Sequence, residues 1–320
     1  MLTKISTYTQ CALVILIVCA LSLTSCNQGG KQKVLDTPTS GHIKVGIDDS
    51  YRLLMAAQLD LFMYFYKDSK IDTLIDSESN IIKLFMKDSI ETMVVSRQLT
   101  KGQMDELQSK SFNARTTLLA HDAIAFVLNK DNKHSNLYYD QVRDIFLGKI
   151  KTWNQIDPKA GLGALQMVFD RNGSANISYF KDKFKLTDFP STFSATKSNE
   201  EIIKYVEKNK NAIGILSVNW ISDPADSISH NFLTRIKVAG ISTVEGSNTG
   251  SEEFYQPYQA YIVDGSYPFT RQIYFIDRQS YSGLGAGLSS FIAGEKGQTI
   301  ILRSGMVPAQ APIRIMEFKK

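Results

Sequence analysis

Cysteine and histidine are scarce in this chain of 320 residues. The three cysteines, Cys11, Cys19 and Cys26, all lie near the N-terminus, so the rest of the chain can form neither a disulfide nor a thiol nucleophile. The four histidines lack the spacing of metal ligands. The Gly-x-Ser-x-Gly motif of serine hydrolases is also absent. We therefore expect no metal site and no cofactor.

The chain also lacks a strong excess of charge. Lysine and arginine total 36 and aspartate and glutamate total 32, which gives a net charge of +4. That charge is too small to indicate a nucleic-acid-binding protein. Hydrophobic residues make up 43% of the sequence, and a chain of this length can bury a sizeable core in two lobes or domains.

The longest apolar run, CALVILIVCALSL, occupies residues 11–23. It is too short to span a bilayer, but it has the length of a signal-peptide core. It ends at Cys26 in the sequence Leu-Thr-Ser-Cys, which is similar to the lipobox of bacterial lipoproteins. We expect residues 1–25 to be a signal peptide, and residues 26–40 to be a lipidated cysteine followed by a flexible tether. An ordinary signal peptide or a short anchor is the alternative.

From His42 onward, strand-like apolar segments alternate with helix-like segments. Strands are expected at 42–47, 92–96, 123–129, 165–169, 212–218, 235–241 and 271–277, and helices at 51–66, 101–108, 140–148, 177–184, 199–210 and 289–305. Thr100 and Asp140 are the expected N-caps of two of these helices. The alternation predicts an α/β fold with mainly parallel sheets, in which ligands bind beyond the carboxyl ends of the strands.

Three junctions between a strand and a helix carry the same kinds of polar residue. They are Asp48-Asp49-Ser50, Ser96-Arg97 and the stretch RNGSAN at 171–176. A helix N-terminus offers unpaired N–H groups and a partial positive charge, and arginine can grip two oxygens of an anion at once. If the junctions converge, they form an oxyanion site. Helix capping alone is the other explanation, since Ser, Asp and Asn are favoured N-caps whatever the function.

Several segments occur together in an order that is similar to a known family. They are VVSRQLT (94–100), HDAIAFVLNKDN (121–132), YYDQVRDIFLGKIKTWNQI (138–156), the GSAN turn (173–176), AIGILSVNW (212–220) and YPFTRQIYFI (267–276). Together they resemble the periplasmic phosphate-binding proteins of ABC-type phosphate uptake systems, in particular the lipoprotein branch typical of Bacteroidetes. The resemblance covers essentially all of residues 41–310. It implies an α/β fold of the two-lobed type II periplasmic-binding-protein class, with a ligand cleft between the lobes.

The resemblance also implies where the lobes and the ligand lie. One lobe would comprise residues 41–120 and 236–320 and the other residues 121–235, and the two would close on the ligand by a hinge motion. The positions that match the family's binding residues are Ser50, Ser96, Arg97, Gly173, Ser174 and Asn176.

Three features depart from the family pattern. The family's Gly-Ser-Gly-Thr turn is Gly-Ser-Ala-Asn in this chain, and its small first loop is Asp48-Asp49-Ser50. The family's arginine lies three residues before the first glycine, where this chain has Asp170, and Arg171 is one residue closer. We include Arg171 among the expected ligand-binding residues.

Asp48 and Asp49 suggest a basis for selectivity. Hydrogen phosphate carries a proton at neutral pH and sulfate does not, so a carboxylate in the cleft would accept a hydrogen bond from phosphate and repel sulfate. Our hypothesis assigns this role to Asp49 or Asp48. Capping a helix or facing water is the alternative for both residues.

The sequence therefore predicts a lipid-anchored, monomeric, non-enzymatic protein of the cell envelope. It would face the periplasm, capture inorganic phosphate or a related oxyanion and deliver it to an ABC permease in the inner membrane. Two alternatives stay open. One is a binding-protein fold that has lost phosphate and acts as an interaction module, and the other is a phosphate-ester hydrolase that uses Asp48 or Asp49.

Overall fold

The computed structural model describes residues 36–222, 231–243 and 253–310. The expected signal peptide, the lipidation site Cys26 and most of the expected tether lie outside these ranges. The strands are β1 (Gly41–Asp48), β2 (Ser69–Asp76), β3 (Thr92–Val95), β4 (Arg115–Asn129), β5 (Asn136–Leu137), β6 (Gln166–Phe169), β7 (Phe193–Ala195), β8 (Ala212–Ser217), β9 (Ile236–Val238), β10 (Gly240–Ser242), β11 (Phe254–Tyr255), β12 (Thr270–Asp277) and β13 (Val307–Pro308). The helices are α2 (Arg52–Phe65), α3 (Glu78–Met86), α4 (Lys101–Ser109), α5 (Tyr139–Phe146), α6 (Ala175–Phe184), α7 (Asn199–Lys208), α9 (Gln259–Val263), α10 (Leu284–Ala293) and α11 (Glu295–Arg303), with 3-10 turns η1 (Asp49–Tyr51), η2 (Trp153–Gln155) and η3 (Val218–Trp220).

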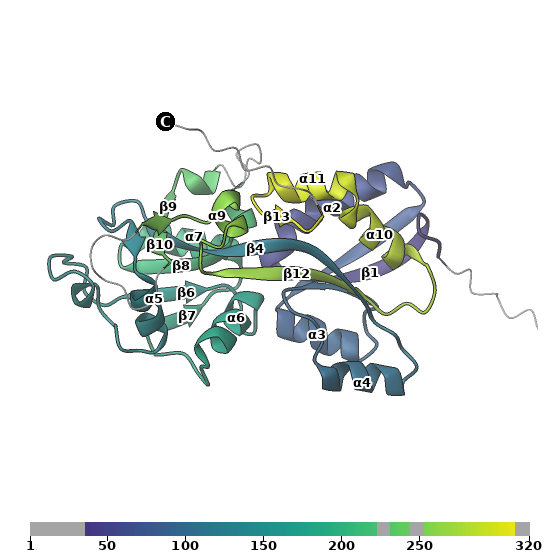
Figure 1. Ribbon diagram of the computed structural model, residues 1–320, viewed down its shortest axis with the longest axis horizontal. Helices are drawn as coiled ribbons and strands as arrows, with labels where there is room; N and C mark the ends of the chain where they lie inside the picture. Colours follow the sequence, from purple (N-terminus) through teal and green to yellow (C-terminus); the bar gives the residue numbers. More distant parts are fainter. Residues whose placement is uncertain (1–35, 223–230, 244–252, 311–320) are drawn as a thin grey trace, which may run out of the picture. The chain divides into compact units, whose positions relative to one another are not determined.

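The main sheet is organised around the long strand β4 (Figure 1). Its strand order is β2-β1-β3-β12-β4-β8-β6-β7, and β9 and β13 also pair with β4. β12 pairs with β4 as far as Ala123, whereas β8 pairs with it from Ile124 onward. A single strand thus takes part in two groups of strands, and its partner changes at the middle of its length.

The sheet is mixed, so the expectation of mainly parallel pairing was wrong. β1 runs parallel to β2 and β3, and β6 runs parallel to β7 and β8. β12 is antiparallel to both of its neighbours, and β4 is antiparallel to β8. Alternating strands and helices predict parallel pairing only for strands that are joined by a helix. β12 lies between β3 and β4 in the sheet, although more than a hundred residues separate it from either strand along the chain.

Most expected elements are present, with shifted ends. Thr100 caps α4 as predicted, and its side chain accepts a hydrogen bond from the backbone N–H of Gln103. Asp140 is not an N-cap, because α5 begins one residue earlier and Tyr138 holds that position. The strand expected at 235–241 is divided into β9 and β10, and the helix expected at 289–305 is divided into α10 and α11 at Gly294. Sequence patterns locate the ends of elements less well than their centres.

β2 and α3 were not predicted. The segment of β2, SKIDTLID, alternates polar and apolar residues only in part, and four of its residues lie half-exposed at the edge of the sheet. α3 has a clear apolar face made of Ile81, Ile82 and Phe85. Ser77 followed by Glu78 at its start was a recognisable helix-start signal. The omission is important because the N-terminus of α3 contributes to the site described below.

Aromatic side chains fill the core beside α6. Phe146 stacks on Phe180 with ring centroids 4.2 Å apart, and Phe126 and Phe269 pack against Phe180 at 5.8 and 5.5 Å. These rings come from α5, α6, β4 and the segment before β12, so they fix α6 against the sheet. Rigid packing at this point holds the first turn of α6 in place.

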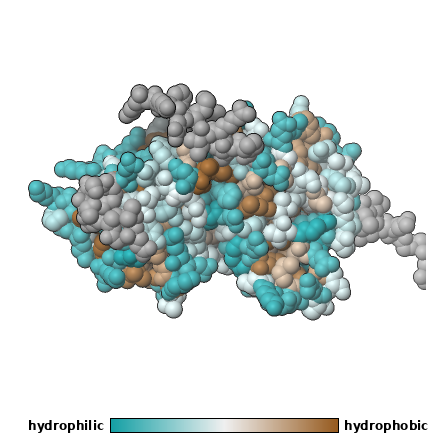
Figure 2. All heavy atoms as spheres, in the orientation of Figure 1, coloured by the Kyte–Doolittle hydropathy of each residue, from teal (hydrophilic) through white to brown (hydrophobic). Residues whose placement is uncertain are grey.

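The surface is mostly hydrophilic, with separate apolar groups, and it is hollowed between α6 and α3 (Figure 2). Among the described residues, no helix combines the length and the apolar character that a membrane crossing requires.

Candidate functional site

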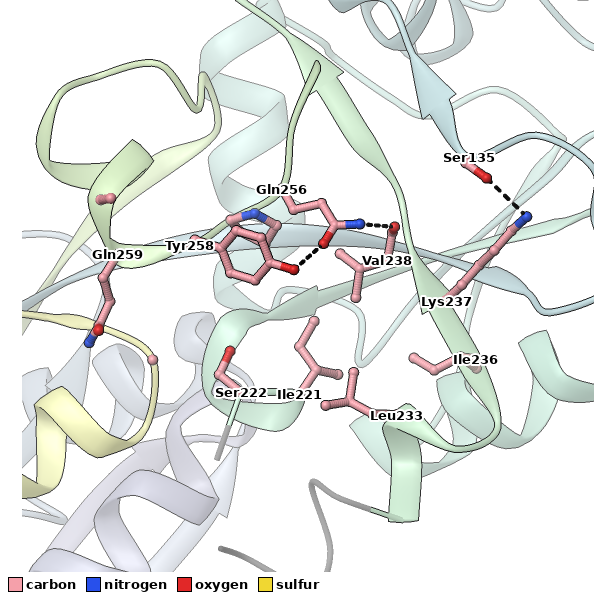
Figure 3. A pocket seen from close by; sticks show the side chains of 13 residues that line it. Ser135, Ile221, Ser222, Leu233, Ile236, Lys237, Val238, Gln256, Tyr258 and Gln259 are labelled. Carbon is pink, nitrogen blue, oxygen red and sulfur yellow. Dashed lines mark hydrogen bonds between the residues drawn. The ribbon is translucent and has the colours of Figure 1, made fainter. Parts of the chain in front are cut away.

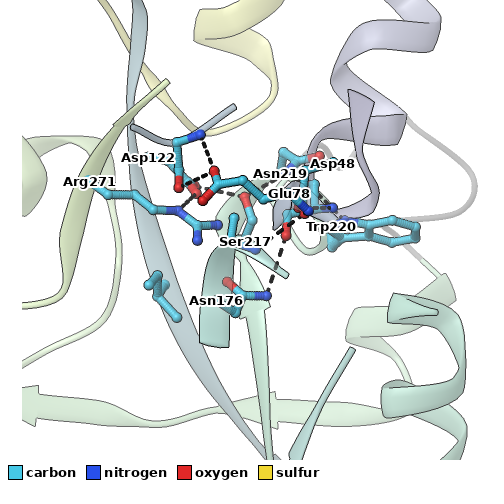
Figure 4. Close-up of polar contacts among 12 residues, drawn as sticks. Asp48, Glu78, Asp122, Asn176, Ser217, Asn219, Trp220 and Arg271 are labelled. Carbon is cyan, nitrogen blue, oxygen red and sulfur yellow. Dashed lines mark hydrogen bonds and ion pairs between the residues drawn. The ribbon is translucent and has the colours of Figure 1, made fainter. Parts of the chain in front are cut away.

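The carboxylate of Asp48 joins the first turns of two helices (Figure 4). Asp48 is the last residue of β1 and is fully buried. Its Oδ2 atom accepts hydrogen bonds from the backbone N–H of Glu78 at 2.7 Å and of Ala175 at 3.2 Å. These are the first residues of α3 and α6. Oδ1 accepts from the backbone N–H of Ser50 at 2.9 Å. One internal anion therefore satisfies the positive ends of two helices that are far apart in the sequence.

Asp49 does the same for a third helix. Its Oδ2 atom accepts from the backbone N–H and the side-chain Nδ2 of Asn199, at 3.1 and 2.8 Å. Asn199 is the first residue of α7. The Oδ1 atom of Asp49 accepts from Nε of Arg52 at 3.0 Å, and Arg52 also pairs with Glu200. Both oxygens of Asp49 are thus engaged.

Ser50 connects the first junction with the third. Its hydroxyl donates to Oδ2 of Asp170 at 3.3 Å, and Nδ2 of Asn176 lies 3.5 Å from the same hydroxyl. Its carbonyl oxygen accepts from Nδ2 of Asn219 and Nε1 of Trp220, at 2.7 and 2.9 Å. The η1 turn is therefore held from several directions.

Ser96 and Arg97, at the end of β3, lie beside the N-terminus of α3. The backbone N–H and the hydroxyl of Ser96 both donate to Oε2 of Glu78, at 2.5 and 2.6 Å. The Oε1 atom of Glu78 is buried and has no hydrogen-bond partner among the described residues. Arg97 donates from Nη1 to Oε1 of Gln103 at 3.3 Å. It is half-buried.

In the third junction, most groups have structural partners. Gly173 has a φ of +75°, and its carbonyl oxygen accepts from the backbone N–H of Ser79 at 3.0 Å. Ser174 caps α6, because its hydroxyl accepts from the backbone N–H of Ile177 at 3.3 Å. Nη1 of Arg171 lies 3.7 Å from Oδ1 of Asp76. Arg171 lines a different pocket from the one that Ser96 and Arg97 line. The structure thus brings the three junctions together but directs Arg171 away from the second one.

A buried ion pair lies beside these junctions and was not predicted. Nε of Arg271, on β12, donates to Oδ2 of Asp122, on β4, at 2.9 Å, and both side chains are almost fully buried. Asp122 also accepts from the hydroxyl of Ser217 at 2.8 Å. Asp122 lies inside β4, which begins well before the strand expected at 123–129. A charged residue within an apolar strand segment, such as Arg271 in YPFTRQIYFI, signals a buried partner.

Several buried acids lie close together and make the site electrostatically unusual. Burial raises the pKa of Asp48. Burial and the nearby charge of Asp48 raise the pKa of Glu78 and raise that of Asp170 to about 7. Burial also raises the pKa of Asp122, although Arg271 opposes this shift. The acids are crowded enough that at least Asp170 binds a proton near neutral pH.

A pocket of about 410 Å³ opens onto this cluster. It lies between the residues that follow β3, the end of α3 nearest them, α6 and β12. Its cationic side chains are Arg97, Lys183 and Arg271 and its carboxylates are Glu78 and Asp182, with hydroxyls from Ser96, Ser178, Tyr179 and Thr270. This lining of three cations, two carboxylates and several hydroxyl donors can bind an anion.

A larger pocket, of about 810 Å³, has a different character (Figure 3). It is lined by apolar side chains such as Ile221, Leu233 and Ile236. Its polar groups bond to one another, for example Nε2 of Gln256 to the carbonyl oxygen of Val238 at 2.9 Å. No cluster of acidic, histidine or cysteine residues suited to a metal ion occurs in the part of the chain that the structure describes. The junction pocket is therefore the better candidate for a binding site.

Comparison with known proteins identifies the family. A family model described as the PBP superfamily domain matches residues 34–296, which is most of the chain. The chain therefore belongs to the PBP superfamily, and its mixed α/β fold is that of periplasmic binding proteins.

Its relatives are distant and are named for phosphate. The phosphate-binding protein PstS of Staphylococcus saprophyticus is 22% identical over 233 residues, covering 71% of this chain and 68% of the relative. PstS of Staphylococcus haemolyticus is 23% identical over 182 residues, covering 56% of this chain and 52% of the relative. The chain thus spans between about half and two thirds of these relatives' length.

Solved structures agree on the fold. A substrate-binding protein with bound phosphate from Clostridium perfringens has a TM-score of 0.69 and 20% identity, and the match covers 84% of this chain and 100% of that one. An ABC-type phosphate transport receptor from Vibrio cholerae has a TM-score of 0.62 and 18% identity, with the same coverage. Identities this low establish a shared fold and leave the ligand open.

Proposed function

We propose that this PBP-superfamily protein is a non-enzymatic solute-binding protein that captures inorganic phosphate, or a related oxyanion, and delivers it to an ABC importer. The observation that carries the proposal is the junction pocket, which Arg97, Lys183 and Arg271 line together with hydroxyl groups, next to the carboxyl end of β3. Ligands of α/β proteins bind at such ends. The names of the relatives support phosphate as the first ligand to test.

The lobes and the anchor belong to the same proposal. Lobes of residues 41–120 with 236–320 and of residues 121–235 are supported by the change of partner strand on β4 between Ala123 and Ile124. The pocket borders both segments, so a hinge at β4 and β12 would open and close it. A lipid anchor at Cys26 would hold a monomer on the periplasmic side of the cell envelope, within reach of the permease.

Selectivity for phosphate over sulfate is assigned to a carboxylate in the pocket. The oxygens of Asp48 and Asp49 already accept hydrogen bonds from helix N-termini. Oε1 of Glu78 has no partner among the described residues, and Glu78 borders the pocket. We therefore extend the selectivity hypothesis to Glu78, whose free oxygen can accept a hydrogen bond from a protonated oxyanion.

A second candidate function follows from the same acids. Asp48 fills the position where two helix N-termini would hold an anion, and Asp170 stands where the family pattern has an arginine. Both features disfavour a dianion at the helix junction. The alternative is a binding fold that has lost phosphate and serves as an interaction module of the cell envelope.

Calorimetric titration of the purified protein with phosphate and then with sulfate separates these functions. The protein is first unfolded and refolded to remove any ligand that co-purifies. We expect micromolar or tighter phosphate binding, about −8 kcal/mol or better, and no heat from sulfate. Glu78→Gln should reduce the ratio of phosphate to sulfate affinity. Absence of heat and of thermal stabilisation with either anion would refute oxyanion capture and favour the second candidate.

A further inference from the structure

Arg271 is a buried arginine whose two terminal nitrogens, which carry four of its five N–H donors, have no hydrogen-bond partner among the described residues (Figure 4). Its side chain is 3% exposed, and Nε is engaged by Asp122. The guanidinium lies over the ring of Tyr51, 5.3 Å from the centroid. Nη1 and Nη2 have no hydrogen-bond partner among the described residues. Leaving buried charged donors unpaired is costly, so such a group in a native fold calls for a partner.

The position of Arg271 shows where that partner would lie. Arg271 lines the junction pocket, together with Ser96, Arg97 and Tyr179. Asp122 and the ring of Tyr51 hold the guanidinium in a fixed orientation. A fixed, planar guanidinium with two free nitrogens matches the spacing of two oxygens on one phosphate, sulfate or carboxylate group.

The N-termini of α3 and α6 are not free to bind the same ligand. Both helices already donate to Oδ2 of Asp48, whose other oxygen is held by Ser50. A ligand at that position would have to displace a fully buried carboxylate that has three backbone partners. Asp48 thus occupies the anion position at the N-termini of α3 and α6, whereas Nη1 and Nη2 of Arg271 have no partner among the described residues.

We propose that Nη1 and Nη2 of Arg271 hold the ligand by donating to two of its oxyanion oxygens, while Asp48 remains in place as the internal anion of α3 and α6. This inference rests on the proposed function and specifies which residue binds the oxyanion. It differs from the sequence-based expectation, which placed the ligand on the three junctions and on Arg171 and did not include Arg271.

Lysine substitution provides the test, because lysine keeps the charge beside Asp122 but cannot span two oxygens. Phosphate is titrated into the wild type, Arg271→Lys, Arg171→Gln and Arg278→Lys. Arg278 is the matched control, since it is 2% exposed and its nitrogens bond to Ile90 and Asp88, away from the pocket. We expect Arg271→Lys to weaken phosphate binding about 10- to 100-fold. Arg278→Lys should change the phosphate affinity less than about 3-fold, because Arg278 shares no contacts with the pocket.

The melting temperature of each ligand-free variant shows whether it has folded. If Arg271→Lys is unfolded, two wall variants at other residues that line the pocket, Ser96→Ala and Arg97→Gln, replace it and should weaken binding. Phosphate binding that survives Arg271→Lys or the wall variants within about 3-fold, or that is lost in Arg171→Gln instead, would overturn the inference while leaving phosphate capture intact.

Failure of the proposed function is recognisable separately. If the wild type binds neither phosphate nor sulfate, thermal stabilisation by glycerol 3-phosphate, phosphonoacetate and succinate is compared between wild type and Arg271→Lys. An anion that stabilises only the wild type would support Arg271 as the binding residue for an organic oxyanion. No stabilisation by any of them would overturn the inference together with the proposed function.

Discussion

Replacing Asp170 with asparagine should stabilise the protein at alkaline pH more than at acidic pH. Asp170 is fully buried, and burial together with the charge of Asp48 raises its pKa to about 7 from an ordinary value of 3.8. Asparagine resembles the protonated carboxyl group and can still accept the hydrogen bond from the hydroxyl of Ser50. The variant therefore keeps the low-pH arrangement at every pH.

The magnitude follows from the difference in pKa between the folded and unfolded chain. Because the folded state holds the proton more tightly, the wild type is most stable below about pH 4, loses stability as the pH rises towards 7, and is nearly constant above that. Three pH units at about 1.4 kcal/mol each give a total of about 4 kcal/mol. Between pH 5 and pH 8, the wild type should lose about 2–3 kcal/mol relative to Asp170→Asn. For a chain of this size, that loss corresponds to about 3–5 °C in melting temperature.

Urea unfolding at pH 5, 6, 7 and 8, on refolded protein in phosphate-free buffer, measures this difference. Asp60→Asn is the control, because Asp60 is exposed on α2 and should leave the pH profile unchanged. If wild type and Asp170→Asn lose stability with pH in parallel, the buried carboxyl does not titrate in the way that its surroundings require.

Two further substitutions test how the junctions are held. Asp49→Ala removes the acceptor for Asn199 at the start of α7 and the partner of Arg52, so urea unfolding should show a loss of about 2 kcal/mol. An unchanged midpoint would mean that solvent replaces these contacts. Gly173→Ala places a Cβ atom 3.0 Å from Oγ of Ser79 at a φ of +75°, and we expect a loss of about 1–2 kcal/mol by the same measurement. Gly102→Ala in α4, where a Cβ meets open space, should instead stabilise the protein by about 0.5–1 kcal/mol. Equal effects of the two substitutions would contradict the argument that the backbone of Gly173 disfavours a side chain.

Local sequence patterns determined much of the fold. The alternation of apolar segments located β1, β3, β4, β6 and most helices, because burial of one face imposes a periodicity that can be read along the chain. The polar residues after β1, β3 and β6 located the edge of the sheet where the site lies, because helix N-termini require acceptors. Family likeness added the class of fold, which the comparisons bear out.

How these residues are used follows from contacts between distant parts of the chain. Asp48 accepts hydrogen bonds from α3 and α6. The hydroxyl of Ser50 donates to Asp170, which lies in the junction between β6 and α6. No local pattern specifies such contacts between distant segments. The capping explanation and the oxyanion explanation of the junctions were equally compatible with the residue types, and the structure shows that Asp48 itself acts as the anion at two helices.

The free arginine is a product of long-range strand pairing in the same way. β12 inserts between β3 and β4, which places Arg271 opposite Asp122 and beside the junctions. Local patterns were enough to predict an edge of the sheet with polar residues suited to an anion, because the requirements of strands and helices are local. Which oxygen each donor meets, and which donors are left for a ligand, depends on packing between segments more than a hundred residues apart, and folding alone brings those together.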